Sequence, residues 1–299
     1  MKTYRDLDML PSGRASDEIT EGCLVLEGGA WRGLYTVGVL DAMMENNINL
    51  RTTVGISAGG LSAIGYVSGQ IGWGARIDLT YRHDGKYCGI RSFFGEKSIT
   101  GFNYLYKHIL KELPLDKHRL NDPSRRLLVG ATNMITGQIN YFKKGTCNLS
   151  RAIQASATVP YLSRPVVIDG IPYMDGGCSE KIPYTWAKEH HEKKIVVVKT
   201  REREFRRKER GADILTRMMY RDYPNFVNSI ANTNIKFNRM ADELEREEKK
   251  KRVYIIAPSK PVTVSRFEGD MEKLGDLYWL GYRDMNDQVN ELKEYLRED

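Results

Sequence analysis

A serine flanked by glycines is the part of this sequence best suited to do chemistry. Gly55-Ile56-Ser57-Ala58-Gly59 follows an apolar segment of strand length and opens a segment with a helical pattern. A serine on a sharp strand-to-helix turn exposes its hydroxyl above the edge of a sheet, and the flanking glycines leave room that a Cβ would fill. The start of the helix also adds partial positive charge beneath the serine. The pattern indicates a nucleophile, and its alternative is a plain strand–turn–helix connection of small residues.

A second glycine-rich turn, Gly28-Gly29-Ala30-Trp31-Arg32-Gly33, also lies between an apolar strand and a helical pattern. Backbone N–H groups in such a loop can converge on an anion or on a developing oxyanion. The phosphate-binding pattern G-x-x-x-x-G-K-[ST] is not met, because Leu34 and Tyr35 follow Gly33, and G-x-G-x-x-G is also absent. We therefore expect this loop to be an oxyanion hole for a nearby serine.

A third turn carries a carboxylate that could serve as a base. Tyr173-Met174-Asp175-Gly176-Gly177 lies downstream of the apolar residues 166–168. An aspartate in a tight turn followed by glycines can approach another loop closely, but Asp-Gly is also a common turn pair at the end of a hairpin. Asp175 is a candidate base because the sequence also contains the two loops described above.

These three loops need a scaffold, and the pattern of apolar runs predicts one. Apolar runs of strand length alternate with helical patterns at 34–44 and 58–68. Continuous apolar strands with helices between them favour an α/β fold of three layers, with a mainly parallel sheet covered on both faces. The predicted strands are residues 23–26, 52–56, 126–132, 138–142, 166–168 and 195–199.

The chain changes character close to residue 200. Residues 199–210 carry seven basic and three acidic side chains, and helical patterns follow at 211–250 and 268–298. We predict a polar lead-in at 1–21, a catalytic domain at 22–205, and a mainly helical C-terminal extension at 206–299 with one strand at 253–257.

Composition narrows the classes of protein that this chain can belong to. Of 299 residues 41% are hydrophobic, and 46 Lys and Arg face 39 Asp and Glu, a net charge of +7. This excludes a disordered or fibrous chain and is modest evidence for an anionic partner. No apolar run approaches the ~18 residues of a spanning helix, and the first ten residues lack the apolar region of a secretory signal. Four widely separated cysteines complete the expectation of a soluble, reduced, cytoplasmic protein.

Taken in order, the three loops resemble the motifs of the patatin-like phospholipases. That family has a G-G-G-x-R-G oxyanion loop, a G-x-S-x-G nucleophile and an Asp-Gly-Gly or Asp-Gly-Ala base. The resemblance covers about residues 22–200, is supported by Gly38-Val39-Leu40 and by residues 155–160, and is closest to the bacterial branch with a C-terminal extension. Ala30 stands where the family has its third glycine, which a backbone of negative φ would tolerate.

The resemblance implies a reaction and the roles of the residues in it. Ser57 would attack an acyl ester, Asp175 would accept its proton, and the N–H groups of Gly28, Gly29 and Ala30 would hold the oxyanion. Arg32 would stabilise the loop or meet a lipid phosphate. The implied substrate is a phospholipid or lysophospholipid, and no cofactor takes part. A substrate of this kind implies peripheral contact with an anionic membrane, at the inner face for a cytoplasmic protein.

Other interpretations remain open from the sequence. His190 or His191 could complete a Ser-His-Asp triad in the order Ser, Asp, His, although both follow a helical pattern at its end. A lipid-binding protein that kept the fold without catalysis is a further alternative. Nucleic-acid binding rests only on the basic run at 199–210 and is not expected, since no finger, helix-turn-helix or RNP pattern occurs. No metal-ligand spacing is present, so we expect no metal.

Two further segments have features that the reaction of Ser57 and Asp175 does not use. Residues 70–125 hold many aromatic residues and several glycines, which suits a lid or acyl channel as well as core packing. Residues 212–230 contain an apolar helical face that would either lie on anionic lipid or pack on its own domain. Its members are Ile214, Leu215, Met218 and Met219, flanked by Arg210, Arg217 and Arg221.

Overall fold

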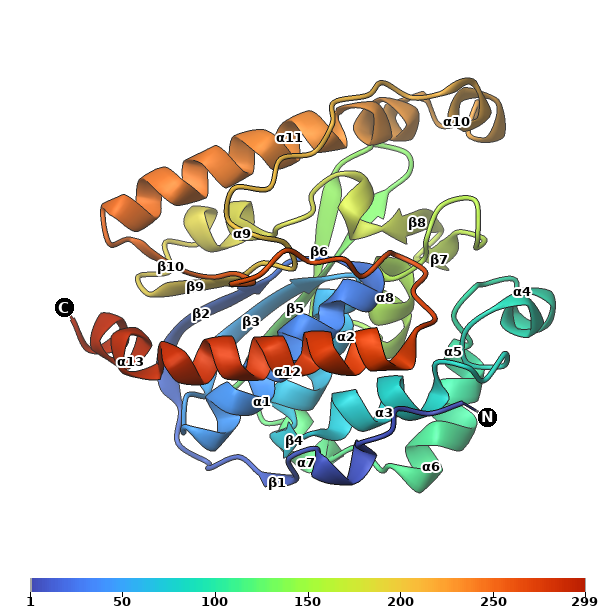
Figure 1. Cartoon of the computed structure of the whole chain (residues 1–299). Helices are drawn as coiled ribbons and strands as arrows, with labels where there is room; N and C mark the ends of the chain where they lie inside the picture. Colours follow the sequence, from blue (N-terminus) through green and yellow to red (C-terminus); the bar gives the residue numbers. More distant parts are fainter. Residues whose placement is uncertain (1, 299) are drawn as a thin grey trace.

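An eight-stranded sheet lies at the centre of the described part of the chain, residues 2–298, in a computed structural model (Figure 1). Its strand order is β10-β9-β2-β3-β5-β8-β7, and β6 also pairs with β5. The strands are β2 (Thr20–Leu26), β3 (Leu50–Ile56), β5 (Arg126–Asn133), β6 (Ile139–Lys143), β7 (Val166–Ile168), β8 (Ile171–Asp175), β9 (Ile195–Val198) and β10 (Val253–Ile256).

The sheet is parallel from β10 through β9, β2 and β3 to β5. Beyond this point it is antiparallel, because β6 and β8 both run against β5 and β7 forms a hairpin with β8. The mainly parallel sheet predicted from the sequence is confirmed, although the predicted strand at 166–168 belongs to the antiparallel part. The carboxyl ends of β2 and β3 meet at one edge of the sheet, where Gly28 and Ser57 follow them.

Helices cover both faces of the sheet, so the fold has the three layers that the sequence predicts (Figure 1). One face carries α1 (Gly33–Glu45), α2 (Ala58–Val67), α3 (Trp73–Tyr81) and α12 (Met271–Asp287), and the other carries α9 (Tyr184–Glu189) and α11 (Pro224–Lys249). Shorter helices are α4 (Ile90–Glu96), α5 (Phe102–Tyr104), α6 (Leu110–Glu112), α7 (Lys117–Leu120), α8 (Leu149–Ser156), α10 (Ile214–Met219) and α13 (Val289–Arg297). A π-helix spans Leu105–Ile109, and β1 (Gly13–Arg14) pairs with β4 (Gln70–Ile71).

The apolar strands are buried on both faces because alternate side chains enter different cores. Along β2, Leu24 and Leu26 pack in the core formed with α1, α2 and α12. Cys23 and Val25 pack in the second core, with α9 and α11. An unbroken apolar run is therefore what each central strand requires.

The C-terminal part of the chain shares the sheet and the cores with the part before it. Strand β10 extends the sheet at β9, and α12 packs against α1 so closely that glycine is needed at the crossing. A Cβ on Gly38 would lie 2.0 Å from the Tyr278 carbonyl oxygen, and one on Gly281 would lie 2.1 Å from that of Tyr35. The boundary at residue 205 stays a prediction, since elements on its two sides are neighbours in one sheet.

Among residues 2–298, no helix combines the length and the hydrophobicity that a membrane span requires.

Candidate active site

The turn between β3 and α2 holds Ser57 in a backbone conformation that few non-glycine residues adopt. Its φ is 54° and its ψ is −123°, and it precedes the first residue of α2. A Cβ on Gly55 would lie 2.6 Å from the Gly59 carbonyl oxygen, and one on Gly59 would lie 2.6 Å from that of Leu26. Both glycines are therefore required by the close packing of the turn, and the strain at Ser57 is of the kind found at functional sites.

Ser57 and Asp175 meet although 118 residues separate them in the sequence. The Ser57 Oγ donates a hydrogen bond of 2.6 Å to Asp175 Oδ2, and the Gly177 N–H donates one of 2.7 Å to Oδ1. Asp175 ends β8, which is held against β5, so the antiparallel part of the sheet carries this carboxylate to the serine. A Cβ on Gly176 would lie 2.4 Å from the Gly130 carbonyl oxygen, which explains the first glycine of the motif.

The environment of Asp175 changes its acidity. Burial raises the pKa of the carboxyl above its ordinary value, while the hydrogen bonds from Ser57 and Gly177 and the charges of Lys181 and Arg266 lower it in part. The net effect is a pKa above that of an exposed aspartate, and hence a stronger base. The same carboxylate is held in position through both oxygens.

A second serine, Ser156, orients the nucleophile, although no sequence pattern predicts a role for it. Its fully buried Oγ accepts a hydrogen bond of 2.8 Å from the Ser57 N–H and donates one of 2.6 Å to the Gly130 carbonyl. Ser156 therefore fixes the backbone of the strained turn to the neighbouring strand β5. Its only sequence signal is its place in residues 155–160, a segment that supports the family resemblance.

The loop after β2 lies directly beside the serine. A Cβ on Gly28 would lie 3.2 Å from the Cβ of Ser57, and one on Gly33 would lie 2.8 Å from the Cβ of Ala58. The glycines at both ends of the loop thus allow it to pack on the nucleophile turn. This closeness is what an oxyanion loop requires.

The hydrogen bonds of the loop correct the predicted set of oxyanion donors. The Gly28 N–H donates to the Lys181 carbonyl at 3.0 Å, so it is not free to meet an oxyanion. Within residues 2–298 the N–H groups of Gly29 and Ala30 have no protein acceptor. Ala30 has φ of 50°, not the negative φ that would make its methyl group harmless, so it adopts a glycine-like conformation at some cost.

Positive charge surrounds this loop from several segments. Arg32 is buried, and burial together with the charges of Arg207 and Arg266 lowers its pKa to about 10. Burial and the charges of Arg207 and Arg266 also lower the pKa of Lys181 to about 8, and its Nζ donates to the Gly177 carbonyl at 2.8 Å. The fully buried Glu27 offsets part of this charge through an ion pair of 3.6 Å with Arg207. The site therefore attracts negative charge.

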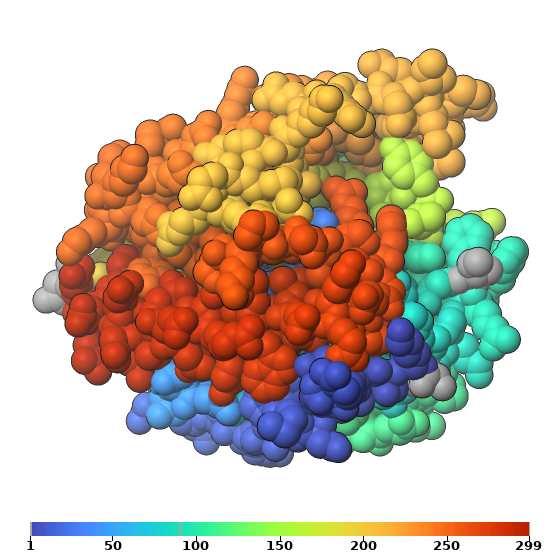
Figure 2. All heavy atoms as spheres, in the orientation of Figure 1, coloured from blue at the N-terminus to red at the C-terminus, as the bar shows by residue number. Residues whose placement is uncertain are grey.

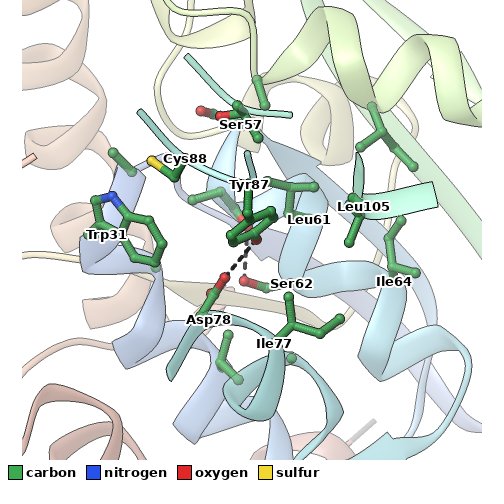
Figure 3. A pocket seen from close by; sticks show the side chains of 18 of the residues that line it. Trp31, Ser57, Leu61, Ser62, Ile64, Ile77, Asp78, Tyr87, Cys88 and Leu105 are labelled. Atoms are coloured by element: carbon green, nitrogen blue, oxygen red, sulfur yellow. Dashed lines mark hydrogen bonds between the residues drawn. The ribbon is translucent and has the colours of Figure 1, made fainter. Parts of the chain in front are cut away.

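A cavity of about 160 Å³ opens beside Ser57 and is lined mainly by apolar side chains. In Figure 3 Ser57 lies at one end and Asp78 and Ile77 lie at the other. Of the aromatic residues predicted for a lid, channel or core, Trp73, Tyr87 and Tyr106 line this cavity. Its mainly apolar lining suits an acyl chain.

The far end of the cavity carries one acidic group. Asp78 accepts a hydrogen bond of 3.0 Å from the Tyr87 hydroxyl, and burial raises the pKa of Asp78 to about 6 (Figure 3). This hydrogen bond connects Tyr87, which lines the cavity, to Asp78 of helix α3.

Within residues 2–298, no hydrogen bond joins His190 or His191 to Ser57 or Asp175. His190 stacks on Trp186 with ring centroids 4.0 Å apart, and its Nδ1 lies 2.8 Å from the Trp186 carbonyl oxygen. Ser57 contacts the carboxylate of Asp175 directly instead. No group of three or more His, Cys, Asp or Glu side chains within residues 2–298 is arranged to hold a metal ion.

A serine on a strained turn, in contact with a carboxylate and beside a glycine loop, has the groups that nucleophilic attack on an ester requires. A family model described as "Patatin-like phospholipase" matches residues 24–187, and the chain belongs to this family. Membership makes it a lipid ester hydrolase. Residues 223–297 match a second model, described as a domain of unknown function (DUF6363).

The chain is also similar to three known proteins in sequence or in fold. The chain is 26% identical over 272 residues to YjjU of Escherichia coli (strain K12), covering 86% of this chain and 74% of YjjU. It is 28% identical over 189 residues to the "Probable lipid hydrolase 463L" of Invertebrate iridescent virus 6, covering 57% of this chain and 64% of that protein. The crystal structure of VipD from Legionella pneumophila is similar in fold, with a TM-score of 0.52, 15% identity and coverage of 97% of this chain and 71% of VipD.

Proposed function

We propose that this lipid ester hydrolase cleaves acyl esters of phospholipids or lysophospholipids, as a phospholipase A or a lysophospholipase, through a Ser57–Asp175 dyad. The observation that carries the proposal is the 2.6 Å hydrogen bond from Ser57 to Asp175 at the mouth of an apolar cavity. The cavity would hold the acyl chain, and the positive charge around the loop would favour a substrate with an anionic head group.

The reaction proceeds in two halves. Asp175 takes the proton of Ser57 Oγ as this oxygen attacks the ester carbonyl carbon, and the N–H groups of Gly29 and Ala30 stabilise the oxyanion. The C–O bond breaks, the alcohol leaves with the proton from Asp175, and the acyl group remains on Ser57. Water then attacks the acyl-enzyme with Asp175 again as base, which releases the fatty acid and restores Ser57.

A carboxylate with an ordinary pKa would be a weak base for this task. The raised pKa of Asp175 reduces the mismatch, and each oxyanion donor contributes about 3–4 kcal/mol in the transition state. The positive end of α2 beneath Ser57 acts in the same direction. Loop and helix together thus compensate for the absence of an imidazole base.

We also propose that the protein acts in the cytoplasm, at the inner face of a membrane. Cys23, Cys88, Cys147 and Cys178 are free, which suits a reducing compartment. A lipid substrate requires contact with a membrane surface, and the net charge of +7 favours an anionic one.

Hydrolysis of p-nitrophenyl butyrate by wild type, Ser57→Ala and Asp175→Asn tests the dyad. We expect kcat/KM to fall by at least about 10³-fold in both variants. Asp169→Asn, an exposed aspartate just before β8, is the matched control and should keep wild-type turnover, as should His190→Ala/His191→Ala. Unchanged turnover in either dyad variant, or a comparable loss in the histidine variant, contradicts the proposal.

A further inference from the structure

Helix α10 exposes an apolar face although the chain holds the helix firmly in place. Ile214, Leu215, Met218 and Met219 are 77%, 55%, 69% and 50% exposed. The opposite face is fixed by Thr216, whose Oγ1 lies 2.6 Å from the Tyr161 hydroxyl oxygen. Of the two alternatives left open by the sequence, packing on the domain is wrong, since the apolar residues point away from it.

A second exposed apolar pair, Phe93 and Phe94 of α4, is connected to α10 through the backbone and two hydrogen bonds. Phe94 is 70% exposed. After α4, the Ile99 N–H donates to the Leu162 carbonyl at 3.0 Å, and the neighbouring Tyr161 N–H donates to the Tyr220 hydroxyl at 2.9 Å, directly after α10. The gold α10 and the cyan α4 segment accordingly lie along one edge of the molecule in Figure 2.

This edge adjoins the active-site cavity. Ile99 and Val159 of the connecting segments line the cavity together with Phe267, which is 55% exposed. We call the exposed apolar residues of α4 and α10, with Tyr161 and Phe267, the docking rim. The connecting segments carry basic residues in excess: residues 90–99, 158–164, 210–221 and 264–268 together hold seven Lys and Arg and three Asp and Glu.

We infer that the docking rim inserts into the interface of an anionic lipid bilayer and brings the cavity mouth onto the membrane surface. Apolar side chains flanked by Arg and Lys are what an interfacial site needs, because the former enter the acyl boundary and the latter contact anionic head groups. The inference rests on the proposed function for its choice of partner. A lipid ester then passes from the bilayer to Ser57 between Ile99, Val159 and Phe267 without crossing water.

Flotation of the full-length protein with vesicles of phosphatidylcholine and phosphatidylglycerol tests the docking rim. The variant Phe94→Ser/Leu215→Ser/Met218→Ser should lose vesicle binding by at least tenfold. Met9→Ser is the control, because Met9 is 70% exposed but belongs to the 3₁₀-helix Leu7–Met9 and not to the rim, and it should bind as wild type does. Wild type should bind pure phosphatidylcholine vesicles more weakly.

Two readouts separate this inference from the proposed function. The triple variant should hydrolyse the water-soluble p-nitrophenyl butyrate at the wild-type rate, and Ser57→Ala should still bind vesicles. Equal flotation of triple variant and wild type, or no flotation of wild type, overturns the docking rim and leaves the dyad untouched. If the triple variant loses flotation but the wild-type protein does not hydrolyse p-nitrophenyl butyrate, the dyad is overturned and the docking rim is supported.

Discussion

Asp175 contacts the nucleophile directly, and its carboxyl is a weaker acid than that of an exposed aspartate. Its two oxygens accept from Ser57 and Gly177, so the carboxylate has one orientation, and burial raises its pKa above the ordinary 3.8. Because the pKa of Asp175 is higher in the folded than in the unfolded state, the ionised carboxylate lowers the free energy of unfolding at high pH. The free energy of unfolding rises again as the pH falls through the raised pKa. Activity changes in the opposite direction, because the base must be ionised.

The pH profile of kcat/KM should therefore show an acid limb above pH 3.8, falling tenfold per unit below the pKa of Asp175. The charge of Lys181 lowers that pKa, so Lys181→Met should move the limb to higher pH. Initial rates with p-nitrophenyl butyrate across the acid range measure both. A limb that stays in place in Lys181→Met would show that Asp175 does not control it.

Ala30 is strained at the oxyanion loop. Its φ of 50° suits glycine, so Ala30→Gly should stabilise the fold by about 0.5–1 kcal/mol and preserve hydrolysis, since the N–H remains. The same change at Ala63, in the middle of α2, should instead destabilise by about 1 kcal/mol or more. Urea unfolding of both variants gives the comparison, and a loss of stability in Ala30→Gly is the contrary outcome.

At the scale of elements, the local patterns were sufficient for the central strands and for the two glycine turns. The runs at 23–26 and 195–198 are apolar because both faces of those strands are buried, a property that the sequence shows without tertiary contacts. The sequence does not predict strand β8, because Pro172 and the Asp175-Gly176 pair resemble a turn. The pairing of β8 with β5 is also non-local. The hydrogen bond from the Gly28 N–H is equally beyond the local pattern, because its acceptor, the Lys181 carbonyl, is far away in the sequence.

The α1–α12 pair depends on glycine where the helices cross. Gly281→Ala would set a Cβ 2.1 Å from the Tyr35 carbonyl oxygen, so we expect a loss of about 2–3 kcal/mol. Gly95→Ala in α4 is the control, since nothing lies within 4 Å of its added Cβ. Thermal unfolding of both should separate them clearly. Equal melting temperatures would mean that α12 moves away at little cost.

At the scale of the whole molecule, the C-terminal region completes the fold that carries the site. It supplies β10 at the edge of the sheet, α12 on one face and α11 on the other. It also supplies Arg266 and Phe267, which line the cavity. The second family model at 223–297 covers this region, and its elements are structural neighbours of the patatin-like part.

Residues 22–205 alone should consequently fail to fold. Ending the chain there exposes the edge of β9 and the apolar face of α1, whose residues pack against α12. We expect the truncated chain to lack near-ultraviolet circular dichroism and to be digested rapidly by protease, unlike the full chain. A stable, cooperatively unfolding fragment would instead make the predicted boundary at 205 a true domain boundary.

Covalent labelling of Ser57 tests the central claim most directly. After reaction with a fluorophosphonate, intact-mass and peptide analysis of wild type should give one adduct on Ser57, with none in Ser57→Ala and much slower formation in Asp175→Asn. Labelling of Asp169→Asn should match wild type. No adduct in the folded wild-type protein, or an adduct that persists in Ser57→Ala, would contradict the Ser57–Asp175 dyad and favour a lipid-binding protein without this chemistry.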